Sequence, residues 1–555
     1  MKWIFPAAHE YTCVRPDASA PVDAGASQRY HCSGSRRKVA PLAQPTPITI
    51  GRGPLSIHDV VEVARLGAPV RLSDEAVEAI AEARAHVERL AASGRPVYGI
   101  STGFGALATR FIEPEKRRQL QRSLVRSHAA GSGPCVEIEV VRALMLLRLS
   151  TLATGRTGVR VETAQAYASL LNAHITPCVP AYGSLGCSGD LAPLAHCALA
   201  VTGEGVVENA EGELKCAAEA LAVAGIAPVE LAEKEGLALI NGTDGMLGML
   251  VMAIEDLTML AKVADISAAM SVEALLGTDA VYAADLQALR PHPGQAASAR
   301  NMVRLLARSA IVASHATGDT RVQDAYSLRC APAVAGAVRD TLDHARAVAE
   351  RELASAIDNP VVLPDGRVES NGNFHGAPIG YVLDFLAIAA ADLASIAERR
   401  TDRMLDKTRS NGLPPFLADD PGVDSGHMIA QYTQAGIVSE MKRLAVPASA
   451  DSIPSSAMQE DHVSMGWSAA RKLRTSVDGL SRVLAIELLT AARALDFRAP
   501  LLPAAGTGAV HALLRTRVAA AGPDRWLSPE IEAAHELVVS GAVVSAAQGA
   551  LGELE

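Results

Sequence analysis

The sequence predicts a mainly α-helical protein, and two features of composition and one of patterning support this prediction. Hydrophobic residues make up 49% of the 555 residues, but aromatic residues only 3%. The core must therefore be filled by Ala, Leu, Val and Ile side chains, which suit close-packed helices. Apolar residues also recur every three or four positions in several long segments, as on the buried face of a helix. A chain of this length can bury a large core.

Charge and composition exclude several classes of protein. The 51 Lys and Arg residues against 61 Asp and Glu residues give a net charge of -10, so no basic field attracts nucleic acid. No stretch approaches the about 18 uninterrupted apolar residues of a membrane span, and the N-terminal apolar run is too short for a secretory signal. The eight cysteines form no C-x-x-C pair, so neither a zinc ribbon nor a disulfide framework is indicated. We expect a cytoplasmic protein without nucleic-acid or membrane partners.

Along the chain, residues 1–48 are rich in Pro, Ala, Ser and Arg without apolar periodicity, which predicts a flexible N-terminal extension. A helix is predicted to begin after Ser73, because two acidic residues occupy its first turn and apolar residues then follow at helical spacing. Gly94 stands where this helix should end. Similar spacing predicts further long helices over 144–152, 246–261, 383–397, 428–444 and 468–495.

Loops rich in Gly, Pro and polar residues interrupt these helices, and such loops commonly carry function. They lie at 98–105, 180–190, 320–332, 358–380 and 445–466. The first loop contains a G-x-S-x-G pattern and a G-x-G-x-x-A pattern. Both are set aside, because a nucleophile elbow and a dinucleotide loop each require a preceding strand that the sequence does not predict.

The loop at 180–190 carries the most specific motif, GSLGCSGDLAPLAH at residues 183–196. Here the chain resembles the histidine and phenylalanine ammonia-lyase family, whose loop reads G-S-x-G-A-S-G-D-L-x-P-L. In that family the central triplet cyclises with loss of two waters to 4-methylidene-imidazole-5-one (MIO). The resemblance implies that Cys187, Ser188 and Gly189 form this group. Cys187 stands where the family has alanine, but its side chain lies outside the ring-forming atoms, so cyclisation is still expected.

Such a group has a chemical purpose, because an amino acid's β-hydrogen is weakly acidic and its ammonium is a poor leaving group. A methylidene conjugated to a ring carbonyl accepts the substrate amine as an electrophile. The reaction then also needs a base. The motif VYGISTGFG at 97–105 resembles the family loop Y-G-V-N-T-G-F-G, whose tyrosine is that base. The resemblance implies this role for Tyr98, while Ser101 replaces the family's asparagine.

Two further strings suggest how substrate is bound. The string LQRSLVRSHAAG at 120–131 resembles the histidine-selective branch, which implies that His128 hydrogen-bonds an imidazole ring. The string QDAYSLRC at 323–330 resembles Q-D-x-Y-S-x-R, in which the arginine binds the substrate carboxylate. A guanidinium suits this role because its planar donors match a carboxylate bidentately. The resemblance assigns it to Arg329, with Gln323 and Tyr326 lining the site. Without the flanking strings, a surface histidine and a bundle salt bridge would remain the alternatives.

The remaining site residues also follow from the resemblance. Asn241 in LINGT would contact the MIO carbonyl or substrate, and Asp244 replaces the glutamine typical of the histidine branch. Phe374 in NGNFHGAPIG would wall the pocket, although GAPIG looks more like the phenylalanine and tyrosine branch. Met428 in GHMIAQ occupies a position where phenylalanine lyases carry lysine.

The string at 447–466 resembles S-x-D-S-x-P-[TS]-S-A-N-Q-E-D-H-V-S-M of the histidine branch. Gln459 and Glu460 thereby inherit substrate-site roles, and Glu460 could accept a proton or hold charge near an imidazole or amine. Asp461 and His462 are adjacent but lack further ligands, so no metal is predicted.

The resemblance covers about residues 50–550 and implies a fold. This is a mainly α fold with a long central helix bundle of the histidine/phenylalanine ammonia-lyase (fumarase/aspartase-like) type and a loop-rich, MIO-bearing N-terminal part. The expected divisions are an extension (1–48), an MIO-bearing domain (49–240), a central bundle (241–495) and a C-terminal helical segment (496–555). The family also implies a homotetramer whose sites combine residues of more than one subunit.

The implied function is elimination of ammonia from an aromatic L-amino acid, with L-histidine giving trans-urocanate as the expected reaction. Two related alternatives share every catalytic residue named: a 2,3-aminomutase that returns the amine to the β-carbon, and a lyase acting on phenylalanine or tyrosine. A third alternative, a helical assembly protein without activity, is disfavoured by the intact triplet, base and carboxylate-binding arginine.

Overall fold

The computed structural model describes residues 46–94, 96–103 and 109–555, so the predicted extension lies, over residues 1–45, outside the described residues. The chain forms two compact units. Unit 1 comprises the chain up to Met252 with Ala349–Gly380 and Ser449–Ser468, and unit 2 comprises Ala253–Val348, Tyr381–Ala448 and Ala469–Glu555. Each unit is discontinuous in sequence, so the boundaries drawn along the chain at 240 and 495 stay predictions.

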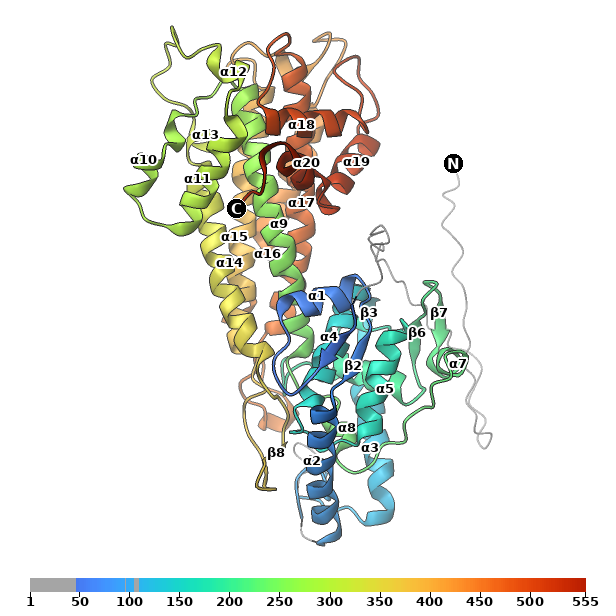
Figure 1. The fold of residues 1–555 in the computed structure, drawn as a ribbon. Coiled ribbons are helices and arrows are strands. Elements are labelled where there is room, and N and C mark those ends of the chain that lie inside the picture. The colour runs from blue at the N-terminus through green and yellow to red at the C-terminus, as the bar shows by residue number, and fades with distance from the viewer. Residues whose placement is uncertain (1–45, 95, 104–108) are drawn as a thin grey trace. The chain divides into compact units, whose positions relative to one another are not determined.

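Unit 1 combines helices with short strands (Figure 1). Its helices are α1 (Ile57–Arg65), α2 (Asp74–Ala92), α3 (Pro114–His128), α4 (Ile138–Ala153), α5 (Val161–Asn172), α6 (Leu191–Val201), α7 (Ala217–Val223), α8 (Glu235–Ala238) and the short η5 (Ser456–Met458). Its strands are β1 (Ile48–Ile50), β2 (Val70–Leu72), β3 (Ser132–Cys135), β4 (Thr176–Pro177), β5 (Pro180–Tyr182), β6 (Val206–Glu208), β7 (Leu214–Cys216), β8 (Val361–Val362) and β9 (Val368–Glu369). β1 and β2 pair in parallel, while β3–β5, β4–β6–β7 and β8–β9 are antiparallel.

Helix α2 confirms the helix that was predicted after Ser73. The Ser73 hydroxyl accepts a hydrogen bond from the Ala76 amide at 3.1 Å, which caps the first turn. Gly94 follows the helix with φ +68°, a left-handed conformation that glycine adopts without steric cost. Local sequence signals therefore set both ends of this helix.

Long helices dominate unit 2, although one end of most of them belongs to unit 1, and they lie side by side in Figure 1. They are α9 (Asp244–Ala274), α14 (Ala331–Leu353), α15 (Ala377–Leu405), α16 (Met428–Leu444) and α17 (Gly466–Asp496). The shorter elements are η2 (Ala280–Tyr282), α10 (Ala284–Ala288), α11 (Pro293–Leu306), α12 (Ala310–Ala313), α13 (Tyr326–Arg329), η3 (Pro415–Leu417), η4 (Ala448–Ala450), α18 (Ala505–Arg515), α19 (Ser528–Val539) and α20 (Ala542–Leu551). The predicted mainly α fold with a long helix bundle is confirmed.

Polar contacts inside the bundle join its helices. Glu487 on α17 is fully buried and accepts hydrogen bonds from Ser267 and Ser271 on α9, both at 2.8 Å. Arg400 on α15 forms an ion pair with the same carboxylate at 2.5 Å. A buried charge is tolerated only when it is paired and hydrogen-bonded. This network therefore favours one register of the three helices.

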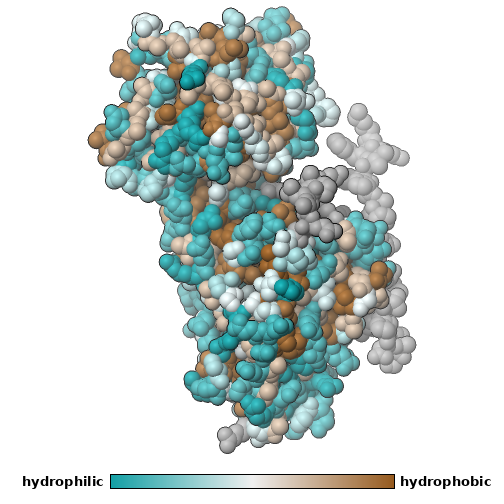
Figure 2. All heavy atoms as spheres, viewed as in Figure 1, coloured by the Kyte–Doolittle hydropathy of each residue, from teal (hydrophilic) through white to brown (hydrophobic). Residues whose placement is uncertain are grey.

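Helix α15 needs a comment because its composition resembles that of a membrane span. By length and hydropathy it could cross a membrane, but 61% of its apolar window is buried inside the protein, as in the core helix of a helical bundle. On the face drawn in Figure 2, hydrophobic residues gather in several patches between hydrophilic ones.

Three of the described cysteines, Cys187, Cys197 and Cys330, carry free thiols. Sequence spacing alone indicated no disulfide framework, because no C-x-x-C pair is present.

Candidate active site

The loop that carries the predicted triplet makes a tight backbone turn in unit 1. Ser188 and Gly189 both have positive φ values, +49° and +83°. Gly189 forms isolated bridges with Gly186 and with Gly242. A Cβ atom at position 189 would lie 2.0 Å from the Gly242 carbonyl oxygen, so only glycine fits this turn.

Asp190 holds the turn against the start of α9. Its amide donates to the Gly242 carbonyl at 2.7 Å. Its carboxylate accepts hydrogen bonds from the Gly245 and Met246 amides at 3.0 and 2.8 Å, and from the Ser184 hydroxyl at 2.9 Å. Burial raises the pKa of Asp190 to about 7. The carboxylate thus satisfies amides of the first turn of α9, which have no partner inside the helix.

Arg148 fixes the neighbouring segment that contains Asn241. This buried side chain extends from α4 and donates to the carbonyls of Ala238, Asn241 and Ile357. It also pairs with Asp244 at 2.8 Å. The Asn241 side-chain amide donates to the Leu237 carbonyl at 3.0 Å. Because Asn241 directly precedes Gly242, the structure brings it next to the triplet.

Glu460 reaches the triplet through a serine. The Ser455 hydroxyl donates to Glu460 Oε2 at 2.9 Å, and Ser455 Oγ lies 3.0 Å from Cys187 Sγ. The main chains of Ser455 and Glu460 also pair with each other, with distances of 2.9 and 3.4 Å. The predicted residue Glu460 is therefore linked to Cys187 by two hydrogen bonds.

His128 ends helix α3 and is half-buried. Its Nδ1 atom lies 2.9 Å from the Leu124 carbonyl oxygen. Burial lowers the pKa of His128, while this backbone contact and the negative charge of Glu460 act in the opposite direction. The negative charge of Glu460 therefore acts on the His128 ring.

Three more predicted residues lie in unit 1. Tyr98 is half-buried in the turn that precedes Ser101, whose hydroxyl accepts a hydrogen bond from the Val97 amide at 2.9 Å. This contact gives a role to the serine that replaces the family's asparagine. Phe104 and Gly105 of the same motif lie outside the described residues. Phe374 is half-buried, and Gln459 is exposed beside Glu460.

The other predicted residues, Gln323, Tyr326, Arg329 and Met428, belong to unit 2. Tyr326 is 71% exposed, and the Arg329 guanidinium carbon lies 4.5 Å from the centre of its ring. This cation–π contact holds the guanidinium on the surface of α13. Met428 is the first residue of α16. The structure therefore gathers the predicted residues into two groups, one in each unit.

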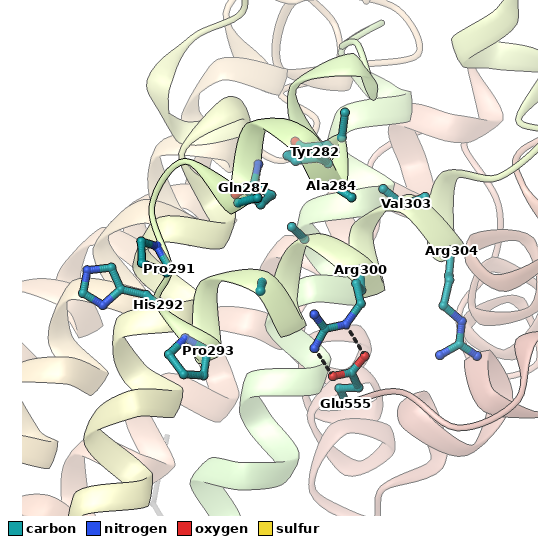
Figure 3. A pocket seen from close by; sticks show the side chains of 14 residues that line it. Tyr282, Ala284, Gln287, Pro291, His292, Pro293, Arg300, Val303, Arg304 and Glu555 are labelled. Carbon is teal, nitrogen blue, oxygen red and sulfur yellow. Dashed lines mark hydrogen bonds and ion pairs between the residues drawn. The ribbon is translucent and has the colours of Figure 1, made fainter.

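A cavity of about 710 Å³ lies elsewhere in unit 2 (Figure 3). Its lining residues come mainly from α10 and α11, and none is a predicted site residue. Two of its charged groups are already paired: Arg300 binds Glu555, and Arg304 donates to the Leu551 carbonyl at 2.6 Å. Nothing in this cavity matches the chemistry of the motifs.

Sequence reasoning did not identify Asp190, Arg148 or Ser455 as parts of the site. Asp190 lies within the family string, and Arg148 is one of two cations inside the mostly apolar helix α4, which is a signal that could have been used. Among the described residues, no group of three or more His, Cys, Asp or Glu side chains could hold a metal ion.

Comparisons with known proteins agree with the motifs. A family model described as aromatic amino acid lyase matches residues 55–516. A histidine ammonia-lyase of Streptomyces avermitilis is 67% identical over 508 residues, which cover 91% of this chain and 99% of that protein. A histidine ammonia-lyase of Gloeobacter violaceus is 49% identical, and the match covers 90% of this chain and 97% of that protein.

Solved structures are also similar. Histidine ammonia-lyase from Trypanosoma cruzi has a TM-score of 0.84 at 38% identity, covering 92% of this chain and 96% of that one. Tyrosine aminomutase from Streptomyces globisporus has a TM-score of 0.86 at 36% identity, and the match covers 92% of this chain and 100% of that one. The resemblance inferred from the motifs is confirmed: the chain belongs to the aromatic amino acid lyase family.

Proposed function

We propose that this protein is an ammonia-lyase that converts L-histidine to trans-urocanate and ammonia, using an MIO group formed by Cys187, Ser188 and Gly189. The observation that carries the proposal is the closed, positive-φ turn at Ser188 and Gly189. A glycine nitrogen must approach the carbonyl carbon two residues earlier for the ring to close. The absence of a side chain at Gly189 and its contact with Gly242 support that compressed geometry.

Once formed, the MIO group supplies an electrophile for the substrate amine. The protein's own residues supply the rest of the chemistry. Tyr98 is the proposed base for the β-proton, and Glu460 is proposed to accept or hold a proton near the imidazole. Arg329 is proposed to bind the substrate carboxylate, because its fork of donors matches two carboxylate oxygens.

The hydrogen bonding of His128 supports imidazole as the group recognised. A carbonyl can only accept, so the contact with Leu124 requires a proton on Nδ1 of His128. Burial lowers the pKa of His128 and favours the neutral ring. Its Nε2 atom is then an acceptor for the N–H of a substrate imidazole, which a phenyl ring lacks. The names of the relatives at 67% and 49% identity point to the same substrate.

We also propose that the protein acts as a cytoplasmic homotetramer, with Arg329 and Tyr326 completing a site in another subunit. Three large apolar side chains at helical spacing, Tyr381, Phe385 and Ile388, are between 43% and 62% exposed on α15. Ile429 and Tyr432 on α16 are 58% and 60% exposed. Exposed apolar stripes of this kind mark protein interfaces, and a second copy is the proposed occupant.

Product analysis tests the proposed reaction. The purified protein is incubated separately with L-histidine, L-phenylalanine and L-tyrosine, and all products are resolved by mass spectrometry. We expect urocanate and ammonia from L-histidine. Cinnamate or coumarate without urocanate would contradict the substrate assignment, and inertness toward all three amino acids would contradict the lyase activity.

A 2,3-aminomutase is the second candidate, favoured by the tyrosine aminomutase structure at TM-score 0.86. The segment Gly376–Gly380, which resembles the phenylalanine and tyrosine branch, favours the other alternative, a lyase acting on those amino acids. A mutase yields a β-amino acid with the same mass as the substrate, whereas a lyase yields a deaminated acrylate. The same product analysis therefore separates the two reactions.

A further inference from the structure

Cys187, Ser455 and Glu460 form a directed chain of hydrogen bonds. A carboxylate oxygen can only accept, so the Ser455 hydroxyl uses its single proton on Glu460 Oε2, 2.9 Å away. The contact of 3.0 Å between Ser455 Oγ and Cys187 Sγ must then be donated by the thiol. Burial raises the pKa of the Cys187 thiol, and so do a hydrogen bond with Glu460 and the charge of that carboxylate, whereas the contact with Ser455 lowers it. The net effect keeps the thiol protonated, as this role requires.

The loop between Ser455 and Glu460 supports a positioning role. Positive φ values of +50°, +54° and +66° occur at Ser456, Ala457 and Met458. Residues other than glycine rarely adopt this backbone conformation. Such strain persists only where surrounding contacts hold it, and it is concentrated at functional sites. Here the two ends of the loop are joined by main-chain hydrogen bonds between Ser455 and Glu460. The contacts of the Ser455 hydroxyl with Glu460 and with the Cys187 thiol connect this loop to the turn that carries the triplet.

The chain of hydrogen bonds ends at Glu460, which acts on the proposed substrate site. Burial lowers the pKa of His128, which belongs to a different element, α3, and the negative charge of Glu460 opposes this shift. An alanine at position 187 would allow the ring to form but would offer no donor to Ser455. The cysteine therefore adds a contact beyond what cyclisation needs.

We propose that Cys187 and Ser455 are positioning residues for Glu460: the thiol orients the serine hydroxyl, and the hydroxyl fixes one carboxylate oxygen, leaving the other for the substrate. This inference rests on the proposed lyase function. It makes the side chain of residue 187 a determinant of the turnover rate, acting through Ser455 and not through the ring.

Kinetics of four variants with L-histidine test the proposal. Ser455→Ala removes a hydrogen bond to a charged group, so kcat should fall about 10- to 100-fold with KM changed less than about twofold. Cys187→Ala removes a weaker neutral donor, so kcat should fall about 2- to 10-fold. Ser455→Thr and Cys187→Ser keep the donors and should restore kcat to within about twofold. Ser169→Ala is the matched control, because the Ser169 hydroxyl donates to the Gln165 carbonyl in an exposed hydrogen bond within α5.

Two further measurements separate positioning from a merely structural role. In a Glu460→Gln background, Cys187→Ala should have no further effect on kcat, because the carboxylate that Cys187 and Ser455 position has lost its charge. The S–H stretching band of Cys187, isolated as the infrared difference between wild type and Cys187→Ala, should shift to higher frequency in Ser455→Ala. An unchanged kcat in Ser455→Ala, an undiminished effect of Cys187→Ala in the Glu460→Gln background, or an unshifted band would overturn the proposal.

Intact mass distinguishes failure of this inference from failure of the proposed function. If wild type lacks the loss of two water equivalents, the proposed function fails. If wild type shows the loss but any of the four variants does not, these residues act on ring formation, and the positioning proposal is wrong.

Discussion

Arg148 and Asp244 form a buried ion pair beside the turn that carries the candidate triplet, with 2.8 Å between Arg148 Nη2 and Asp244 Oδ2 and side-chain exposures of 0% and 6%. The same guanidinium binds three carbonyls of the surrounding segments, including that of Asn241. The site therefore rests on one buried cation that joins α4 to the loop before α9.

Replacing this cation should destabilise the protein strongly. Arg148→Met leaves the Asp244 carboxylate buried without a counter-ion, which costs about 3–5 kcal/mol. Urea-induced unfolding followed by circular dichroism measures the loss. Arg126→Met is the control, since the Arg126–Glu204 pair is 52% and 35% exposed and such pairs contribute about 1 kcal/mol or less. Equal losses in the two variants would contradict the importance of the buried pair.

Asp190 predicts a pH dependence of stability. Its folded pKa of about 7 lies above the ordinary aspartate value of 3.8, so the folded state binds the proton more tightly than the unfolded state. This contribution is complete below about pH 4 and is lost as the pH rises through about 7, with a slope of at most about 1.4 kcal/mol per pH unit. Asp190→Asn keeps the shape and an acceptor oxygen but does not titrate.

The difference in unfolding free energy between wild type and Asp190→Asn should therefore move in favour of the variant from pH 4 to pH 7. Other buried carboxylates titrate in both proteins and largely cancel in this difference. Urea unfolding at several pH values provides the measurement. A difference that stays constant with pH would show that Asp190 is ionised throughout this range.

Substitutions of Ser188 and Tyr98 should affect ring formation differently, although both should reduce turnover. Ser188→Ala removes the hydroxyl whose loss creates the methylidene, so both turnover and the loss of two water equivalents should be abolished. Tyr98→Phe should retain the mass loss but slow turnover about 10²- to 10⁴-fold, as expected for removal of a proton-transfer group. Intact-mass spectrometry and initial rates of urocanate formation check both. Full activity of Ser188→Ala would refute the mechanism.

Gly189 is predicted to tolerate no side chain. In Gly189→Ala the new Cβ atom would lie 2.0 Å from the Gly242 carbonyl oxygen, at a φ of +83° that alanine disfavours. We expect loss of ring formation, measured by intact mass, together with a lower unfolding temperature. Gly53→Ala is the matched control, because no atom lies within 4 Å of a Cβ built there. Normal cyclisation in Gly189→Ala would mean that the turn relaxes readily.

His128 predicts the substrate preference. His128→Leu removes the proposed acceptor for imidazole, so kcat/KM for L-histidine should fall about tenfold, the effect of one lost hydrogen bond between neutral groups. Values of kcat/KM for L-phenylalanine and L-tyrosine should stay the same or rise. His58→Leu, at a side chain that is 79% exposed on α1, serves as the control. A uniform fall for all three substrates would assign His128 to folding and not to recognition.

Much of the helical framework could be predicted from local signals. The Ser73 cap, the acidic first turn of α2 and the stripe of apolar residues on α17 depend on residues within a few positions of each other. The predicted ends of α2 and α17 agree with the structure to within about two residues, because helical hydrogen bonds join residues four positions apart. Helix α9, predicted over 246–261, continues to Ala274, because burial inside the bundle extends it beyond its local signal. The candidate triplet Cys187, Ser188 and Gly189 could be proposed from one contiguous string for the same reason.

The sequence by itself determined the helical class, the family and the motifs, since each depends on residues that are close together along the chain. Tertiary structure alone decided which distant groups support them: Asp190 at the start of α9, Arg148 beside Asn241, and Ser455 between Cys187 and Glu460. These pairs are separated by 56, 93 and 268 positions. No periodicity or local spacing encodes such contacts, because they form only when packing of the core brings separate segments together.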